Sequence, residues 1–245
     1  MERSIQNLRH IINKSKRLVA FSGAGLSAES GISTYRGAGG LWSKYDPNIY
    51  ANIDIFLKDS TYYWNFFKDE RYNTIKQSRP NKLHKILTKM EKDGKLLCVI
   101  TQNIDGLHQL SGQKKVIELH GNTRKIVCLR CRNTFTMEEI YKKLDRQLPP
   151  ICKCGGMLKP DTVFFGEQLP QDALREAQLI SQRCDVFLVL GSSLVVYPAA
   201  HLPILAKQNN AKLAIINIDP TPLDNIADIV INEKVSKVLS KIVTY

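Results

Sequence analysis

The sequence lacks the features that mark membrane, secreted and repeat proteins. No apolar run approaches the roughly 20 residues that a helix needs to cross a bilayer. The N-terminal stretch 1–17 is charged and amphipathic, without the apolar segment and small-residue cleavage site of a secretory signal. Internal repeats and low-complexity linkers are also missing. We therefore expect a cytoplasmic protein that makes no contact with a membrane.

Two hydrolytic signatures are missing as well. The chain has no G-x-S-x-G turn, which would expose a nucleophilic serine. It also has no H-E-x-x-H helix, which would hold a catalytic zinc. Hydrolysis by a serine nucleophile or by a metal-activated water is therefore not supported.

Positive charge is plentiful but is spread along the chain. The 245 residues carry a net charge of +12, and 43% of them are hydrophobic, which is enough for a substantial core. Half of the net charge falls in residues 122–160, which contain nine Lys or Arg residues against three acidic ones. A solvated basic face is the simpler interpretation, and binding of nucleic acid stays open as an alternative.

Apolar segments rich in β-branched residues alternate with helical patterns. Such continuous apolar strands are typical of a parallel sheet that helices cover on both faces. The strands are expected at RLVAFSG (17–23), LLCVITQ (96–102), VIELHG (116–121), DVFLVLGSS (185–193), KLAIINID (212–219) and DIVIN (228–232). The helices are expected over 3–16, 82–93, 171–182, 198–209 and 235–242. The pattern predicts an α/β fold with a doubly wound, Rossmann-like parallel sheet.

Two segments interrupt this pattern. Residues 38–75 combine loops with an aromatic helix that contains YYWNFF, and residues 121–160 hold four cysteines around a helical MEEIYKKL. Both segments return the chain to the main sheet. We predict that they form one small inserted domain, a helical insertion plus a zinc ribbon, and that 1–37, 76–120 and 161–245 form the Rossmann-like domain.

Nearly every predicted strand ends in residues suited to binding a ligand. In open parallel sheets, ligands bind in the crevice outside the carboxyl ends of the strands. One polar strand end is ordinary, but five at the edge of one sheet indicate a crevice. These ends are Gly23–Gly25, Gln102–Asp105, His120, Gly191–Ser193 and Asn217–Asp219.

The first of these strand ends has the form G-x-G-x-x-A, across Gly23, Gly25 and Ala28. The small residues permit a tight turn and a close approach of the backbone to a pyrophosphate, although a glycine turn without a ligand is an equally simple interpretation. No acidic residue ends a second strand about twenty residues later, as a dinucleotide site would normally have, because Asp46 lies in loop-like sequence. The candidate partners for a ribose are therefore Asn217 and Asp219.

Four of the six cysteines form two close pairs. In a cytosolic protein such pairs indicate a metal before a disulfide, and four thiolates suit a closed, tetrahedral structural zinc site. The second pair is C-x-C rather than C-x-x-C, which strains the geometry slightly. A redox pair and a DNA-reading ribbon are the alternatives, although no recognition helix is evident. The expected ligands of one zinc ion are Cys128, Cys131, Cys152 and Cys154.

His120 follows a strand and precedes a glycine, on the same predicted rim as Gln102, Asn103 and Asp105. The ordinary pKa of histidine, near 6.5, suits a general base. The other histidines lie in helical or loop contexts and are interpreted as structural or exposed. They are His10, His84, His108 and His201.

Taken together, these motifs resemble the sirtuin family, the NAD-dependent protein lysine deacylases. The matching segments run in the family's order from about residue 18 to residue 220. They are GAGLSAESGISTYRG (23–37), TQNIDGLH (101–108), ELHG (118–121), the four cysteines, VFFGE (163–167) and GSSLVVYPA (191–199). The resemblance implies an enzyme that transfers the acyl group of acyl-lysine to ADP-ribose and releases nicotinamide.

The resemblance also implies the residues of the site. His120 would act as general base, Asn103 would position groups or water, and Asp105 would bind the carboxamide of nicotinamide. NAD would contact Gly23, Ala24, Gly25, Ala28, Tyr35, Arg36, Gln102, Asn103, Ile104, Asp105, Gly191, Ser192, Ser193, Asn217, Ile218 and Asp219. The acyl-lysine peptide would add as a strand beside VFFGE and LVVYP, near Phe67, Val163, Phe164, Gly166 and Val196.

One departure from the family bears on the acyl group. Members that prefer acidic acyl groups carry Tyr-x-x-Arg on the aromatic helix. The corresponding residues here are Phe67 and Glu70, with Arg71 one residue out of register. An acyl carboxylate would meet an apolar ring and a like charge. We therefore expect acetyl or longer apolar acyl groups in preference to succinyl or malonyl, unless these residues only pack the small domain.

Two other functions stay open. Mono-ADP-ribosyl transfer or simple NAD hydrolysis shares the first bond cleavage, although the intact VFFGE and LVVYP segments favour a peptide substrate. The second alternative is a non-catalytic module that binds NAD or nucleic acid. The triplet His120, Asn103 and Asp105 disfavours it, since a binding module does not need these residues. Proteins that carry acyl-lysine are thus the expected partners.

Overall fold

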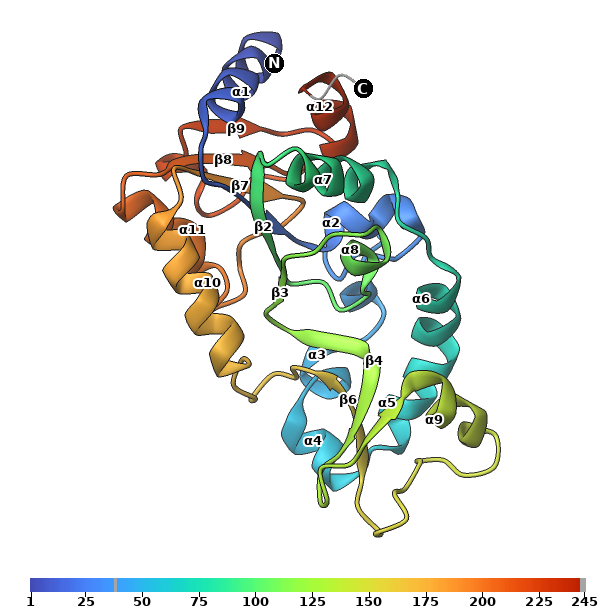
Figure 1. Ribbon diagram of the computed structural model, residues 1–245. Helices are drawn as coiled ribbons and strands as arrows, with labels where there is room; N and C mark the ends of the chain where they lie inside the picture. The colour runs from blue at the N-terminus through green and yellow to red at the C-terminus, as the bar shows by residue number, and fades with distance from the viewer. Residues whose placement is uncertain (38, 243–245) are drawn as a thin grey trace.

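The computed structural model describes residues 1–37 and 39–242, which form two β-sheets and the helices around them (Figure 1). The larger sheet has six parallel strands in the order β3-β2-β1-β7-β8-β9. They are β1 (Leu18–Ser22), β2 (Leu96–Thr101), β3 (Val116–Glu118), β7 (Val186–Leu190), β8 (Lys212–Ile216) and β9 (Ile229–Ile231). The order of connection reverses between the central strands β1 and β7, and open parallel sheets bind their ligands outside the strand ends at such a point.

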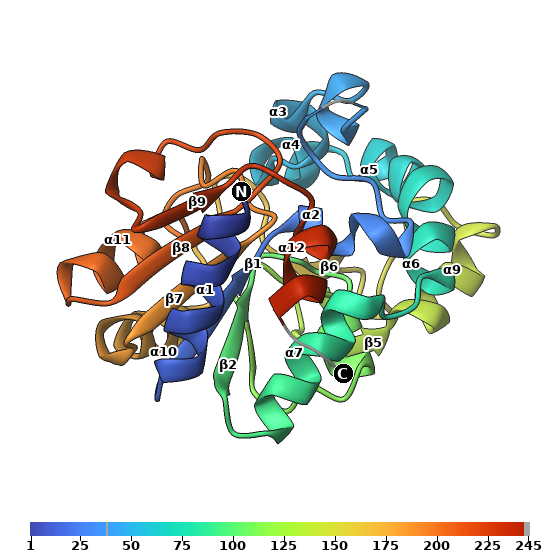
Figure 2. The ribbon, with the colours of Figure 1, turned by 90° about the horizontal axis from the view of Figure 1, so that it is seen from above.

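The predicted strands form because their residues are apolar on both faces. All five residues of β1 and of β7 are buried. Side chains alternate along a strand, so Leu18 and Ala20 join one apolar cluster while Val19 and Phe21 join another. The first cluster includes α1 (Glu2–Lys14), α7 (Lys82–Lys92) and α12 (Val235–Ile242), and the second includes α10 (Gln171–Arg183) and α11 (His201–Gln208). Figure 2 shows the two groups of helices on opposite sides of the sheet, which confirms the doubly wound fold.

The second sheet is antiparallel, with three strands in the order β5-β4-β6. Its strands are β4 (Gly121–Cys128), β5 (Thr134–Thr136) and β6 (Leu158–Thr162), and helix α9 (Met137–Leu144) packs beside them. Trp64 and Phe67 from the aromatic helix share one apolar cluster with Ile126 of β4 and Ile140 of α9. The two interrupting segments therefore pack on each other, and the cysteine ribbon and the helical insertion share one core.

The remaining helices are short. They are α2 (Ala24–Ser27), α3 (Pro47–Tyr50), α4 (Ile53–Lys58), α5 (Thr61–Phe66), α6 (Asn73–Gln77) and α8 (Leu107–Leu110), with 3₁₀ turns at Ala28–Ser30, Leu41–Ser43 and Asp224–Ile226. Between α5 and α6 the chain widens into a π-helical turn, η3 (Phe67–Tyr72). The helix expected over 198–209 begins only at His201. Before it, the backbone makes i→i+3 hydrogen bonds, from His201 N to the Pro198 carbonyl oxygen and from Leu202 N to the Ala199 carbonyl oxygen. No helix within the described residues has the length and apolar content to span a membrane.

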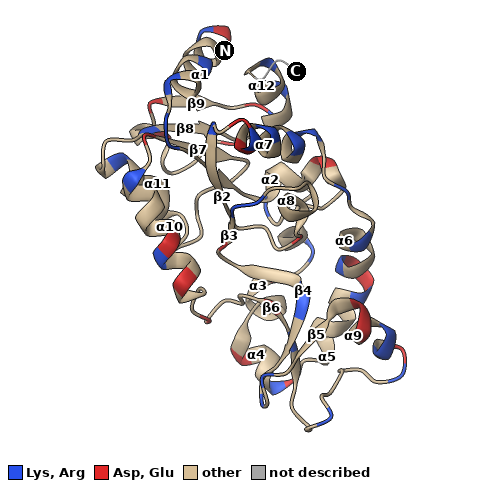
Figure 3. Ribbon diagram, in the orientation of Figure 1, with Lys and Arg blue, Asp and Glu red and all other residues tan. Residues whose placement is uncertain are grey.

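Basic side chains are dispersed over the molecule. Figure 3 shows Lys and Arg on helices at both ends of the molecule, interspersed with Asp and Glu. Within residues 122–160, Arg124 pairs with Glu118 at 2.9 Å. Lys159 is only 6% exposed, and its Nζ lies 2.9 Å from the Glu167 carboxylate. Counting Lys159 towards a solvated basic face was therefore wrong.

Two histidines from neighbouring helices form a buried pair. His84 on α7 and His108 on α8 are both almost fully buried, with ring centroids 4.9 Å apart. His108 Nε2 lies 2.9 Å from the Ser22 hydroxyl, while His84 Nε2 and His108 Nδ1 have no hydrogen-bond partner among the described residues. Burial lowers the pKa of His84 to about 4 and the pKa of His108 to about 3. Both rings are therefore neutral at pH 7 and pack as part of the buried interior.

We predict that this pair makes folding sensitive to mild acid. The pKa of each ring is 6.5 in the unfolded chain and lower in the folded protein, so the unfolded state binds more protons as the pH falls below 6.5. Lowering the pH from 6.5 to 5.5 should reduce the free energy of unfolding by about 1 kcal/mol per histidine. Urea denaturation at both pH values measures this change. His108→Gln should lose about half of it, and an unchanged pH dependence in that variant would contradict the prediction.

Candidate active site

The glycine turn after β1 packs directly against the end of β7. Gly23 N donates to the Leu190 carbonyl oxygen at 3.0 Å, and Gly25 N donates to the Gly191 carbonyl oxygen at 2.9 Å. A Cβ on Gly25 would lie 2.9 Å from Gly191 Cα, and Gly191 itself has a φ of +63°. Backbone contact alone therefore requires glycine at these positions. The same contact closes one end of the predicted crevice.

Asn103 and Asp105 turn towards this glycine turn and join a buried network. Asn103 Nδ2 donates to the Gly23 carbonyl oxygen at 3.0 Å and to the Ser27 hydroxyl at 3.1 Å. The Ser27 hydroxyl donates to Asp105 Oδ2 at 2.8 Å, and Asp105 Oδ1 accepts from Leu107 N at 2.9 Å. Burial raises the pKa of Asp105, and its hydrogen bonds oppose that shift only in part. Both side chains are thus held in one orientation.

His120 lies at the junction of β3 and β4, beside the end of β2. Its Nδ1 lies 3.1 Å from the Gln102 carbonyl oxygen, and because a carbonyl only accepts, Nδ1 carries the hydrogen. Nε2 is left as the acceptor, which is the tautomer that a general base needs. Burial lowers the pKa of His120, and the hydrogen bond to Gln102 opposes this shift. The ring is therefore neutral at pH 7.

One cavity of about 240 Å³ joins His120 to the predicted substrate residues. The predicted site residues that line it are Tyr35, Arg36, Phe67, Gln102, Ile104, His120, Val163, Phe164, Gly166 and Val196. Residues that the sequence analysis did not name line it as well, among them Trp42, Tyr63 and Phe66. The aromatic run YYWNFF is the one sequence signal that could have indicated Tyr63 and Phe66.

The other predicted NAD residues lie at neighbouring strand ends and do not line this cavity. They are Gly23, Ala24, Gly25 and Ala28 after β1, Asn103 and Asp105 after β2, Gly191, Ser192 and Ser193 after β7, and Asn217, Ile218 and Asp219 after β8. Gln102 Nε2 donates to the Ser192 hydroxyl at 2.8 Å and connects the two groups. Asn217 Nδ2 donates to the Asp219 carbonyl oxygen, and Ile218 is 60% exposed. All these groups share one edge of the sheet.

The prediction that Glu70 faces the acyl group is wrong. Residues 67–72 form the π-helical turn η3, whose extra residue rotates the side chains that follow Phe67. Arg71, four residues after Phe67, lines the cavity and is 6% exposed. Glu70 instead accepts a hydrogen bond from the Tyr45 hydroxyl at 2.7 Å. Glu70 therefore supplies no like charge against an acidic acyl group.

The VFFGE segment follows β6 and is held by an ion pair between buried Lys159 and half-buried Glu167. Val163 N donates to the His120 carbonyl oxygen at 3.0 Å, which places the segment beside the histidine. Glu167 accepts hydrogen bonds from Phe164 N at 2.8 Å and from Lys159 Nζ at 2.9 Å. Burial lowers the pKa of Lys159, and the Glu167 charge opposes this shift. The pair fixes the loop that forms one wall of the cavity.

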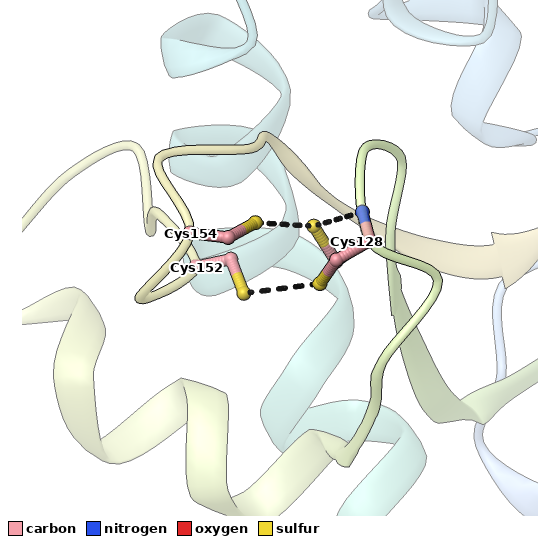
Figure 4. Close-up of side chains that lie close together, drawn as sticks. Cys128, Cys152 and Cys154 are labelled. Atoms are coloured by element: carbon pink, nitrogen blue, oxygen red, sulfur yellow. Dashed lines mark hydrogen bonds between the residues drawn. The ribbon is translucent and has the colours of Figure 1, made fainter.

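The four cysteines meet at the end of β4 opposite His120, and Figure 4 shows the thiols of Cys128, Cys152 and Cys154 close together. The Sγ atoms of Cys128 and Cys154 are 3.5 Å apart, and those of Cys131 and Cys152 are 3.8 Å apart. All four Sγ atoms lie within 4.8 Å of one another. A tetrahedral zinc ion with Zn–S bonds of about 2.3 Å separates its sulfur atoms by about 3.8 Å. The cluster therefore fits one structural zinc ion, as predicted.

Two glycines accommodate the short C-x-C spacing. Gly155 has a φ of +79°, and a Cβ on Gly156 would lie 2.7 Å from Cys128 Sγ. Cys152 N donates to the Gly156 carbonyl oxygen at 2.9 Å and closes a turn around the second pair. This turn brings Cys152 and Cys154 to face the first pair.

Comparison with known proteins agrees with this geometry. The Sir2 family model matches residues 23–198. The chain is 46% identical over 228 residues to an NAD-dependent protein deacetylase of Sulfurisphaera tokodaii, across 93% of this chain and 90% of the relative. A solved structure of Sir2 with a peptide and NAD⁺ has a TM-score of 0.91 at 42% identity, and one of a Sir2 protein bound to a propionylated peptide has a TM-score of 0.90 at 40% identity. Each covers 97% of this chain and 96% of the solved chain.

We predict one zinc ion per chain and a fold that depends on it. Metal binding contributes on the order of 10–16 kcal/mol to small zinc modules, so loss of a ligand should be strongly destabilising. Cys131→Ser should lower the zinc content measured by mass spectrometry and reduce the melting temperature. Cys184→Ala, a change outside the cluster, should keep full zinc. A Cys131→Ser protein that retains both its zinc and its melting temperature would exclude this role.

Proposed function

Since the chain belongs to the Sir2 family, we propose that it is an NAD-dependent protein deacylase, which transfers the acyl group of acyl-lysine to ADP-ribose and releases nicotinamide. The observation that carries this proposal is the single cavity in which His120 shares its walls with Gln102 and the VFFGE segment. The relatives support it, since they include a deacetylase and Sir2 proteins with NAD⁺ or an acylated peptide.

The strand ends fit NAD because glycines at Gly23, Gly25 and Gly191 leave the backbone without side chains at the point where a Cβ would collide. The turn Gly23–Ala28 and Arg36 would hold the pyrophosphate, with Tyr35 towards the nicotinamide ribose. Gly191–Ser193 and Asn217–Asp219 would hold the adenosine half. When bound, NAD supplies an electrophilic ribose carbon and nicotinamide as its leaving group.

His120 is placed to take a proton during the reaction. With Nδ1 held by the Gln102 carbonyl oxygen, Nε2 accepts the proton of a substrate hydroxyl. Asn103, fixed by Gly23 and Ser27, positions groups or water at the end of β2. Asp105, which accepts a hydrogen bond from Ser27, would bind the carboxamide of nicotinamide.

The substrate peptide would add as a strand between VFFGE and LVVYP. Gly166 and Val196 line the cavity from these two segments. Three apolar side chains are exposed along them: Phe165 at 40%, Val195 at 45% and Tyr197 at 60%. An extended peptide would cover these side chains and direct one acyl-lysine into the cavity.

The inner wall of the cavity suits acetyl and longer apolar acyl groups. Phe67, Phe164 and Leu169 line it and are each less than a tenth exposed. The similarity to a Sir2 protein bound to a propionylated peptide supports an acyl chain longer than acetyl.

We predict that nicotinamide and free-lysine peptide form together. With NAD and an acetyl-lysine peptide, mass spectrometry should detect both products in equal amounts. His120→Ala should lower the rate by at least about 100-fold, because general-base catalysis typically contributes 10²- to 10⁴-fold. His201→Ala, which changes an exposed histidine on α11, should leave the rate unchanged.

Nicotinamide release without deacylated peptide would instead indicate NAD hydrolysis or mono-ADP-ribosyl transfer. No turnover with either acetyl or long-chain peptides would overturn the proposal and leave a binding protein.

We also predict how the rate depends on pH. A general base must be deprotonated, and burial lowers the pKa of His120 below its ordinary 6.5. The value of kcat/KM should therefore fall to half of its maximum only at a pH below 6.5. Circular dichroism at each pH separates this decline from acid unfolding. A half-maximal rate above pH 6.5 in folded protein would contradict the prediction.

A further inference from the structure

Glu118, two residues before His120, accepts hydrogen bonds from side chains of two other elements. Arg124 Nη2 donates to its two carboxylate oxygens at 2.9 Å and 3.0 Å. Gln109 Nε2 donates to it at 2.8 Å and Asn122 Nδ2 at 3.1 Å. Glu118 ends β3, Asn122 and Arg124 lie on β4, and Gln109 lies on α8. One carboxylate, 17% exposed, thus joins the strands on either side of His120.

The other terminal nitrogen of Arg124 lies on the turn that carries Asp105. A Cβ on Gly106 would lie 2.1 Å from Arg124 Nη1, so the guanidinium occupies the space that a side chain would fill. Gly106 has a φ of +75° and directly precedes α8. Burial raises the pKa of Asp105, and the Arg124 charge is one of the influences that oppose this shift. Arg124 therefore bridges Glu118 and the turn after Asp105.

Other hydrogen bonds join the same two segments of the chain. Leu119 N and Thr123 N each donate to a carbonyl oxygen of segment 101–106, at 2.9 Å. Between these two bonds, His120 Nδ1 lies 3.1 Å from the Gln102 carbonyl oxygen. The direction of the imidazole is therefore set by how the two segments lie against each other, and the bridge between Glu118 and Arg124 adds a side-chain contact to this junction.

We propose that Glu118 and Arg124 are positioning residues, which hold His120 and Asp105 in one relative arrangement for deacylation. This proposal rests on the deacylase function, because neither residue lines the cavity and both act through His120 and Asp105. Arg124 is 45% exposed, and an ion pair with such a partner adds little to stability. Geometry matters more, since a displacement of about 1 Å in a reacting group can cost on the order of 100-fold in rate.

A guanidinium suits this role because it offers nitrogens in a planar fork. Nη2 reaches Glu118 while Nη1 covers Gly106. The ammonium of a lysine would keep the charge beside Glu118 but would leave the turn uncovered. The bridge therefore requires arginine rather than any cation at position 124.

Kinetics with an acetyl-lysine peptide test the proposal. Arg124→Met and Glu118→Gln should each lower kcat by roughly 10- to 100-fold, with little change in peptide KM or melting temperature. Arg124→Lys should lie between these variants and the native enzyme. The exchange of Glu118→Arg with Arg124→Glu restores the pair in reverse and should recover part of the lost rate. Lys125→Met, which changes a neighbouring lysine paired with Asp161, should leave kcat as it is.

Nitrogen NMR of the histidine rings gives a readout that does not need turnover. The His120 signals, identified by their absence in His120→Ala, should show one tautomer with hydrogen on Nδ1 in the native protein. Arg124→Met should give a mixture of tautomers.

Native kcat and native His120 signals in both single variants would overturn the proposal. So would a loss of rate that only follows a lower melting temperature and is not recovered by the charge exchange. If the native protein removes no acyl group, the deacylase function fails, and the His120 signals alone decide whether the bridge orients the ring.

Discussion

The contact between the glycine turn and Gly191 is the constraint on which the site depends. Gly23 and Gly25 meet Gly191 backbone to backbone, at distances that leave no room for a Cβ. The carboxyl ends of β1 and β7 are thereby held together where the order of the sheet reverses. The Gly23 carbonyl oxygen then holds Asn103, and the residue after Gly191 holds Gln102. Backbone packing thus positions the polar side chains before any ligand contributes.

Burial shifts the pKa values of Asp105 and His120 in opposite directions. It raises the pKa of Asp105 and lowers the pKa of His120, because each group loses solvation in its charged form. Both groups are thereby drawn towards neutrality. Arg71 is the exception, since a guanidinium stays protonated in proteins.

Much of the fold and part of the site could be predicted from local pattern. Continuous apolar runs indicated the parallel strands, whose polar ends must converge, and the cysteine spacing indicated the metal cluster. The position of Arg71 could not be predicted, because it depends on one extra residue in a helical turn. The pairing of His84 with His108 depends on the packing of two separate helices. Lys159 was counted as surface charge because its partner, Glu167, is brought to it only by the fold.

Strand β4 runs from His120 to the cysteine cluster. It begins directly after His120 and ends at Cys128, a zinc ligand, so a span on the order of 25 Å lies between imidazole and thiolates. At that range the ion has no electronic influence on a reacting bond. Its influence on His120 would instead be structural, because β4 joins the cysteine cluster directly to the residue after His120. Oxidation of the thiolates would therefore disturb catalysis through a change of shape and leave the intrinsic acidity of the histidine alone.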